Sequence, residues 1–328
     1  MKHAILIVSS LFCSSLIAAD WNLKNENEIY DLMPLTTKGK FSSETLYNST
    51  NADDKVLTLN AVNYFTYKHS NSNLNENFNF GVLDSLEVGL SVGYQFSDEV
   101  KLTYGPASGS NGLVETYKES GLTSPAINAR YRLFSQSTSF ANSDFIFSFS
   151  PKIGTSKDAT ANKKGNALCE SSLLVVGLEF GKKYTDMAWR MGAKGSFYGT
   201  GKSEDADDST STTAKDSYID MLIDGSWQWT FSSKYILNAT LGFGSVGDIV
   251  STTSSHTKTN EQKRDYTLFG VDFKYLLSKE TYLGLGISSK SFDKSNLVVS
   301  DTQTHVIVNI PEAATSDTSL SLSIKTEF

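Results

Sequence analysis

The sequence predicts an all-β fold, an antiparallel up-and-down barrel of twelve strands that spans a membrane, with fourteen strands as the alternative. Three observations favour this fold class. The chain ends on a strand-like segment with one apolar face, segments of alternating polarity recur along the chain, and the connections between them alternate between short and long. Each observation is weak alone, and the combination predicts the barrel.

The final segment, residues 318–328, carries the clearest alternation. Leu320, Leu322 and Ile324 share one face, while serines and charged residues occupy the other, and the chain ends on Phe328. A period of two is the pattern of a strand whose two sides meet different surroundings. A soluble sandwich strand has the same pattern in isolation, but a terminal aromatic residue also fits the interfacial girdle of a membrane barrel.

The first residues predict export. Lys2 precedes a short apolar stretch that ends in small residues, which is typical of a secretory signal peptide over residues 1–19, cleaved after Ala19. Residues 20–37 show no clean period, and we expect them to form a periplasmic lead-in or a plug in the lumen. Residues 38–328 are then the outer-membrane barrel.

Composition excludes several other classes of protein. No later apolar run reaches the roughly 20 residues that a membrane helix needs, and aromatic residues make up 12% of a chain with 23 Gly and five Pro. Cys169 is the single cysteine after the signal peptide, so an intrachain disulfide and a cysteine metal site are both excluded. The net charge of −7 argues against a nucleic-acid partner.

Eleven segments with this alternation are expected to form wall strands, and they are about as long as a tilted membrane strand. In one of them, Leu86, Val88 and Leu90 alternate with Glu87 and Gly89. The segments are 77–83, 86–97, 126–134, 144–154, 170–181, 187–198, 217–231, 235–246, 265–277, 281–290 and 318–328.

The connections fix the count of strands. Short turns lie near 84–85, 135–142, 182–186, 232–234 and 278–280, and long polar segments lie at 97–120, 156–168, 199–216, 247–263 and 291–317. Short periplasmic turns and long extracellular loops alternate in this way in outer-membrane barrels. Parity then requires one more strand before residue 77, which is either 38–47 or 56–68 but not both. Residues 306–310 are strand-like but are expected within the last loop.

Two motifs suggest a family. Residues 81–90 (GVLDSLEVGL) resemble the "YGLTD-x-LE-x-G" turn of the MetA-pathway phenol-degradation family of outer-membrane proteins, and residues 120–133 (SGLTSPAINARYRL) resemble its "SGLGD-x-x-x-x-x-KYRL" segment. Residues 149–155 are similar to its following strand. The resemblance implies a barrel of the transporter or channel type. The family name reflects gene context and does not imply that the barrel degrades phenol.

Charged residues at the strand positions that are expected to face the lumen are the first candidates for function. They could neutralise one another across a narrow lumen, or they could form a ring that selects solutes by charge. The candidates are Glu87, Arg130, Arg132, Lys152, Glu179, Arg190, Lys194, Asp220, Asp224, Asp272 and Lys274. For a small hydrophobic or aromatic solute, Tyr64, Phe134, Tyr218 and Tyr282 are expected as inward aromatic residues.

The sequence therefore predicts a channel or transporter for small solutes in the outer membrane of a Gram-negative cell. A structural or surface-contact barrel that does not conduct is the main alternative, and a barrel-embedded hydrolase is the second. We expect no enzyme activity, since His69, His256 and His305 fall in predicted loops. We expect no cofactor or metal either, because the acidic stretch 204–208 lacks the spacing of a calcium loop. The expected partners are outer-membrane lipid and the barrel-assembly machinery, through Phe328; the oligomeric state has no marker in the sequence.

Overall fold

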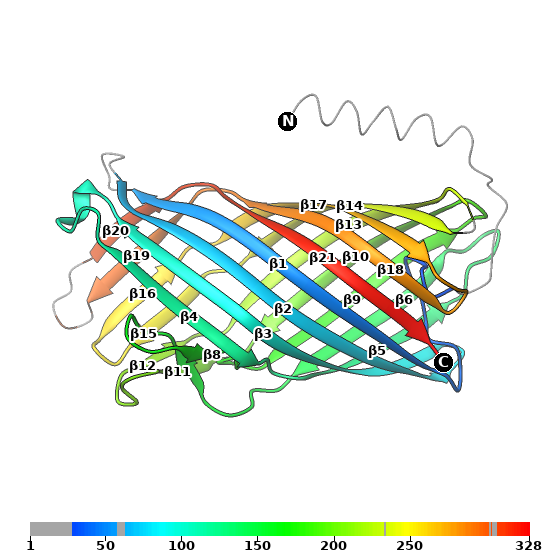
Figure 1. The fold of residues 1–328 in the computed structure, drawn as a ribbon, viewed down its shortest axis with the longest axis horizontal. Coiled ribbons are helices and arrows are strands. Elements are labelled where there is room, and N and C mark those ends of the chain that lie inside the picture. The colour runs from blue at the N-terminus through cyan, green and yellow to red at the C-terminus, as the bar shows by residue number, and fades with distance from the viewer. Residues whose placement is uncertain (1–27, 58–62, 233, 302, 304–306) are drawn as a thin grey trace, which may run out of the picture.

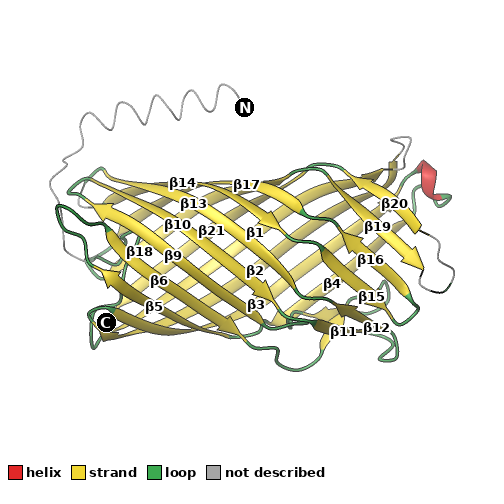
Figure 2. Ribbon diagram, turned by 180° about the vertical axis from the view of Figure 1, so that it is seen from behind, coloured by secondary structure: helices red, strands yellow, loops and turns green. Residues whose placement is uncertain are grey.

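A computed structural model describes residues 28–328 apart from 58–62, 233, 302 and 304–306. The predicted signal peptide and residues 20–27 lie outside this part of the chain. Within it, twelve antiparallel strands pair in sequence order into a closed ring, as predicted. Figures 1 and 2 show this barrel from two sides. No helix among the described residues is long and apolar enough to cross a membrane.

The wall consists of strands β1 (Phe41–Leu57), β2 (Asn63–Leu83), β3 (Leu86–Tyr104), β5 (Ala126–Phe134), β6 (Asn142–Ser150), β9 (Leu173–Lys183), β10 (Met187–Tyr198), β13 (Tyr218–Thr230), β14 (Tyr235–Val246), β17 (Arg264–Leu276), β18 (Thr281–Phe292) and β21 (Thr315–Glu327). β21 pairs with β1 and closes the ring, with Thr45 opposite Ile324. Phe41 and Phe328 exchange two backbone hydrogen bonds at its end. The predicted role of the last strand is thereby confirmed.

The first hairpin differs from the prediction. Segment 38–47 runs into β1, and segment 56–68 straddles the end of β1 and the start of β2, so both contribute to the wall. β2 extends back to Asn63 and contains the predicted strand 77–83. The prediction was wrong because residues 48–55 and 68–76 are polar on both faces, which removes the alternation without interrupting the backbone pairing.

The segments predicted as long loops also contain strands, which extend the barrel away from the C-terminal end (Figure 1). They are β4 (Val114–Leu122), β7 (Ser156–Asp158), β8 (Gly165–Asn166), β11 (Gly201–Asp205), β12 (Thr212–Lys215), β15 (Ile249–Thr253), β16 (Thr257–Glu261), β19 (Ser295–Asp301) and β20 (Ile307–Glu312), with one short helix, η1 (Pro106–Ser108). β20 pairs with β19 beyond the ring and meets the end of β1 at Glu312 alone, which agrees with the prediction for residues 307–310, the described part of segment 306–310. Strands such as β11 and β12 are polar on both faces, so their pairing leaves no hydrophobic period, whereas β19 and β20 carry apolar residues such as Val298 and Ile307.

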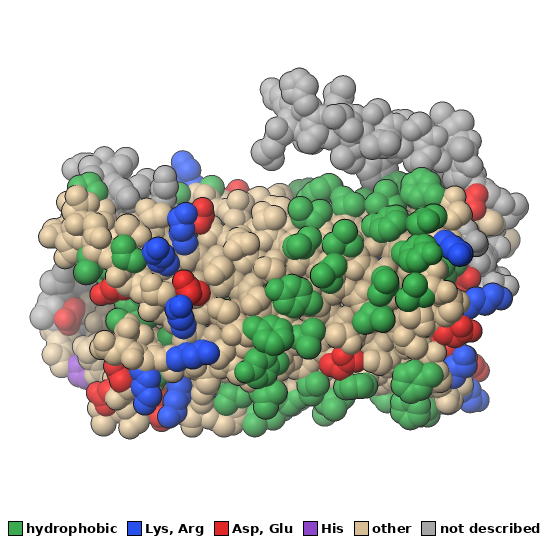
Figure 3. Space-filling model, in the orientation of Figure 1, with side chains coloured by type: hydrophobic (Ala, Val, Ile, Leu, Met, Phe, Trp, Pro, Cys, Tyr) green, Lys and Arg blue, Asp and Glu red, His purple; other side chains and the backbone are tan. Residues whose placement is uncertain are grey.

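The outer surface of the wall carries an apolar belt (Figure 3). Its residues alternate with buried or half-buried polar neighbours, as Leu320 and Leu322 do on β21. At the C-terminal end, Phe41 lies 4.7 Å from Phe80 and 6.3 Å from Phe328 between ring centroids. This cluster is an aromatic girdle of the kind found where a barrel meets the membrane interface.

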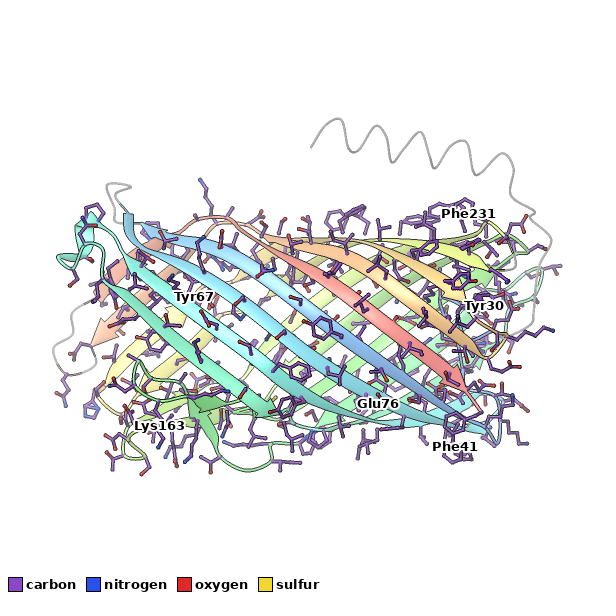
Figure 4. The ribbon with its side chains drawn as sticks, in the orientation of Figure 1. Tyr30, Phe41, Tyr67, Glu76, Lys163 and Phe231 are labelled. Carbon is purple, nitrogen blue, oxygen red and sulfur yellow. The ribbon has the colours of Figure 1, made fainter. Side chains whose placement is uncertain are left out.

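The buried apolar core lies inside the barrel. Ile29 and Tyr30, which precede the first strand, form a buried cluster with Ile236, Leu276 and Tyr282 of the wall. Figure 4 shows Tyr30 at the same end of the barrel as Phe41. The segment 28–37 therefore occupies the lumen at this end, which the short turns identify as the periplasmic end.

One glycine makes the close approach of this segment possible. A Cβ added to Gly81 of β2 would lie 2.3 Å from the carbonyl oxygen of Thr37 and 2.4 Å from that of Thr36. Both distances are far below van der Waals contact, so a side chain at position 81 would displace the backbone of the segment.

Candidate functional site

Three wall strands, β5, β6 and β9, bring charged side chains together in the lumen near its periplasmic end. We call this group the lower charge cluster. Arg132 on β5 donates from Nε to Asp144 Oδ1 at 2.8 Å, and Arg130 lies 3.5 Å from the other oxygen of that carboxylate. Arg130 also donates to Glu179 of β9 at 3.0 Å. Asp144 and Glu179 are 0% and 1% exposed, whereas the neighbouring side chain Phe180 points outward and is 46% exposed.

The cluster continues onto the next two strands. Arg190 on β10 pairs with both Glu179 and Asp224 and donates to Ser226 of β13 at 3.0 Å. Lys194 lies 3.3 Å from Glu179. The candidates Arg130, Arg132, Glu179, Arg190, Lys194 and Asp224 thus meet in one network with Asp144. Four cations face three anions in it, so most of the charge is neutralised locally.

A second group of polar side chains lies across the lumen. Lys274 on β17 is 4.0 Å from Asp272 and 4.9 Å from the ring centroid of Tyr282. Asp272 accepts a hydrogen bond from Asn238, and Tyr282 donates to Glu44 of β1 at 3.0 Å. Tyr282 is buried in the lumen, as its parity predicts.

The lumen segment 28–37 is held by charges from several strands. Lys183 on β9 lies 2.5 Å from Glu28 and 2.7 Å from Asp31. Lys274 donates to the carbonyl of Tyr30 at 3.2 Å, and Arg132 donates to that of Met33 at 2.7 Å.

Glu87 on β3, another predicted site residue, accepts hydrogen bonds from Thr36 at 2.6 Å (backbone) and 2.5 Å (hydroxyl). This carboxylate therefore contacts the lumen segment, as the side chains of Lys274 and Arg132 do. Three of the predicted inward charges serve as anchors for the lumen segment.

Higher in the barrel, aromatic rings surround a single ion pair. Lys290 on β18 lies 3.9 Å from Asp220 and 3.7 Å above the ring of Tyr266, whose hydroxyl donates to Asp220 at 2.8 Å. The rings of Tyr198 and Tyr218 stack nearby at 4.2 Å. Tyr218 is the second of the predicted inward aromatic residues that the structure places in the lumen.

Two predicted residues lie outside this arrangement. Lys152 follows the end of β6, and its ammonium donates to the carbonyl of Lys202 among the outer strands. Phe134 is 65% exposed, because the register of β5 shifts between Arg132 and Phe134 and reverses the side on which later residues lie. The side chain of Tyr64 lies outside the described part of the structure.

The sequence reading missed a column of amides on β2. Asn75 donates to Asn73 at 2.8 Å, and Asn73 donates to Asn71 at 3.0 Å, so alternate residues of one strand hydrogen-bond along the lumen. Asn77 accepts from Ser91, which in turn accepts from Asn128. Asparagines at every second position were visible in the sequence, but without apolar partners they were read as a loop. Uncharged polar groups therefore connect the upper lumen with the lower charge cluster.

At the far end of this column lies a cavity of about 500 Å³, which we call the outer-mouth cavity. It is lined by Tyr67, His69, Asp98, Val100, Tyr117, Glu119, Asp158 and Ala159, from β2, β3, β4 and the segment that begins with β7. His69 lies on a strand, which corrects its predicted loop position. Its Nε2 is 2.7 Å from Asp98, which also accepts hydrogen bonds from Asn71 and Gln95.

The outer-mouth cavity lies beyond the membrane-spanning part of the wall. On β3 the outward apolar side chains end at Phe96, and the outward Glu99 pairs with Lys118 of β4 at 2.9 Å. Burial raises the pKa of Glu119 to about 7, and nearby carboxylates add to the effect. The hydrogen bond to Asp98 raises the pKa of His69.

His69 oriented by Asp98 resembles the base and orienter of a hydrolase, but no Ser, Thr or Cys is among the described residues that line the cavity. No group of three or more His, Cys, Asp or Glu side chains in the described part of the chain is arranged to hold a metal ion. In the acidic stretch 204–208, Asp208 accepts hydrogen bonds from Thr210.

A closed ring of antiparallel strands, apolar outside and polar within, defines an outer-membrane β-barrel. The crystal structure of the COG4313 outer membrane channel from Pseudomonas putida F1 is similar in fold, with a TM-score of 0.54, 13% sequence identity, and coverage of 93% of this chain and 100% of that one. At this identity the likeness shows the fold alone. No family model and no curated protein matches the sequence, so the resemblance to the MetA-pathway family is not confirmed.

Two further solved structures are less similar. A FadL homologue from Pseudomonas aeruginosa has a TM-score of 0.47 at 10% identity, with coverage of 94% of this chain and 99% of that one. The outer membrane protease OmpT from Escherichia coli has a TM-score of 0.38 at 7% identity, with coverage of 90% and 99%. At these scores neither likeness favours a channel over an enzyme.

Proposed function

We propose that this protein is an outer-membrane channel for small solutes. The observation that carries the proposal is the lumen itself, where the amide column leads from the outer-mouth cavity toward the lower charge cluster. Polar groups along a water-accessible path replace the hydration of a passing solute. In this proposal the partners are outer-membrane lipid and the assembly machinery, which would recognise Phe328.

The solute class that we propose is small and hydrophobic or aromatic. Support comes from the rings of Tyr198, Tyr218 and Tyr266, which surround the Lys290–Asp220 pair in the upper lumen. Aromatic rings of this kind stack on a flat solute, while the polar groups beside them fix its orientation.

Conductance in planar bilayers tests the channel. The full-length mature protein, reconstituted in lipid, is expected to conduct KCl, and phenol added on one side is expected to reduce the current by occupying the lumen. Silence at all voltages, with a correctly folded barrel shown by circular dichroism, would contradict the proposal.

The second candidate is a structural or surface-contact barrel that does not conduct. It is favoured by one observation, the position of segment 28–37 inside the periplasmic end of the lumen. The same bilayer experiment on the wild-type protein separates the two, because a barrel that this segment closes stays silent. Hydrolase activity is tested by incubating the purified protein with peptide and phospholipid substrates. We expect no product from either.

A further inference from the structure

The outer-mouth cavity has an unbalanced charge. Three of its lining residues are acids, namely Asp98, Glu119 and Asp158, and among the described residues that line it there is no Lys or Arg. His69 can offset one of these charges through its contact with Asp98. A volume of about 500 Å³ lies in the range of small-molecule sites.

Glu119 is the least satisfied of the three acids. Asp98 accepts hydrogen bonds from three side chains, and Asp158 accepts one from Ser203 at 2.6 Å. Glu119 accepts a hydrogen bond from the backbone of Ala159 at 3.3 Å, and in the described part of the chain no Lys or Arg lies within ion-pairing distance of it. A half-buried carboxylate with so few donors is stabilised by any cation that enters the cavity.

The shape of the cavity favours an organic cation over a metal ion. The volume of about 500 Å³ is far larger than a metal ion, and the described side chains include no group of three or more His, Cys, Asp or Glu that could hold one. The side chains of Tyr67, Tyr117 and Val100 supply apolar surface between them. Aromatic faces attract ammonium groups and also cover an apolar body.

We propose that the outer-mouth cavity binds a small organic ammonium ion with an aromatic or apolar body, with Glu119 and Asp158 facing its charge. The inference rests on the proposed channel function, because the site would then be the first that a solute meets on its way inward. It narrows the solute class from small hydrophobic or aromatic compounds to those that also carry an ammonium group.

Titration calorimetry on the full-length protein in detergent tests the site, with benzylammonium chloride as the probe and benzyl alcohol as its neutral counterpart. Benzylammonium is expected to bind at least about tenfold more tightly than benzyl alcohol, and Glu119→Gln is expected to weaken its binding by about tenfold or more. Glu99→Gln is the matched control: it removes an acid on the outward face at almost the same level and is expected to leave the affinity unchanged. Asp158→Asn replaces Glu119→Gln should that variant fail to fold.

Three results would overturn the proposal: equal binding of the amine and the alcohol, unchanged binding in both cavity variants, or displacement of the amine by stoichiometric Ca²⁺. KCl conductance of the same preparation separates this inference from the channel. If the protein conducts but does not bind the amine, the amine site is contradicted and the channel is not. If it binds the amine but does not conduct, the site is supported and the channel is contradicted.

Discussion

Lys183 holds the lumen segment, and its replacement by Met should release that segment. The side chain of Lys183 is 11% exposed, and its ammonium contacts Glu28 at 2.5 Å and Asp31 at 2.7 Å; the side chain of Asp31 is 9% exposed. Removal of one partner from a buried ion pair costs about 3–5 kcal/mol, because the other charge stays buried without compensation. Since lumen water can reach the site, we take the lower end, about 3 kcal/mol, which corresponds to a roughly hundredfold shift in the docking equilibrium.

The assay is single-channel recording of the variant in planar bilayers. Lys183→Met should raise the open-state occupancy or the mean conductance. The increase should be no larger than the shift in the docking equilibrium, which is roughly hundredfold. Lys182→Met is the control, because that neighbouring ammonium donates to the exposed Thr138 carbonyl and does not touch the segment.

Gly81→Val should release the same segment through a steric clash instead of the loss of an ion pair. The Cβ of a valine at position 81 would overlap the carbonyl groups of residues 36 and 37. Gly270→Ala is its control, with no atom nearer than 3.5 Å. If Lys183→Met and Gly81→Val both conduct as the wild type does, the segment does not restrict the lumen and the reasoning fails.

Two further predictions concern charge. Replacing both Arg130 and Arg132 by Ala leaves Asp144 without the cations that surround it, so the reversal potential in a KCl gradient should shift toward cation selectivity; an unchanged potential would remove the selectivity role. Benzylammonium should bind more tightly as the pH rises from about 6 to about 8. Over this range Glu119, whose pKa burial raises to about 7, becomes negative. This change makes the cavity more negative, and affinity that is flat or falls across this range would contradict the site.

Most of the wall could be predicted from the sequence because the membrane forces an alternation on every strand that crosses it. Strand segments that lack this alternation were not predicted. β1 and the first half of β2 carry Asn, Ser and charged residues on both faces, so their pairing left no hydrophobic signal. The outer hairpins such as β11 and β12 are hidden for the same reason, since water surrounds both of their faces.

The sequence predicts which wall residues face the lumen, but it does not predict which of them contact one another. Parity places Glu179 and Arg190 inward, and it would also have placed Asp144, which lies on the same face as Ser148. The docking of Ile29 and Tyr30 had no periodic signal, because an irregular segment obeys none. One hint was available: Ile236 is apolar at an inward position of β14, and an apolar side chain facing a wet lumen requires a partner.

The central claim is that lipid lies outside the wall and water lies within it. Single cysteines on β21, in a Cys169→Ser background and labelled with a polarity-sensitive fluorophore, test it in vesicles that contain brominated lipid. Labels at Leu320, Leu322 and Ile324 should be quenched strongly, and labels at the two intervening serines, Ser321 and Ser323, should not. Equal quenching at consecutive positions, or quenching at the serines alone, would contradict the account.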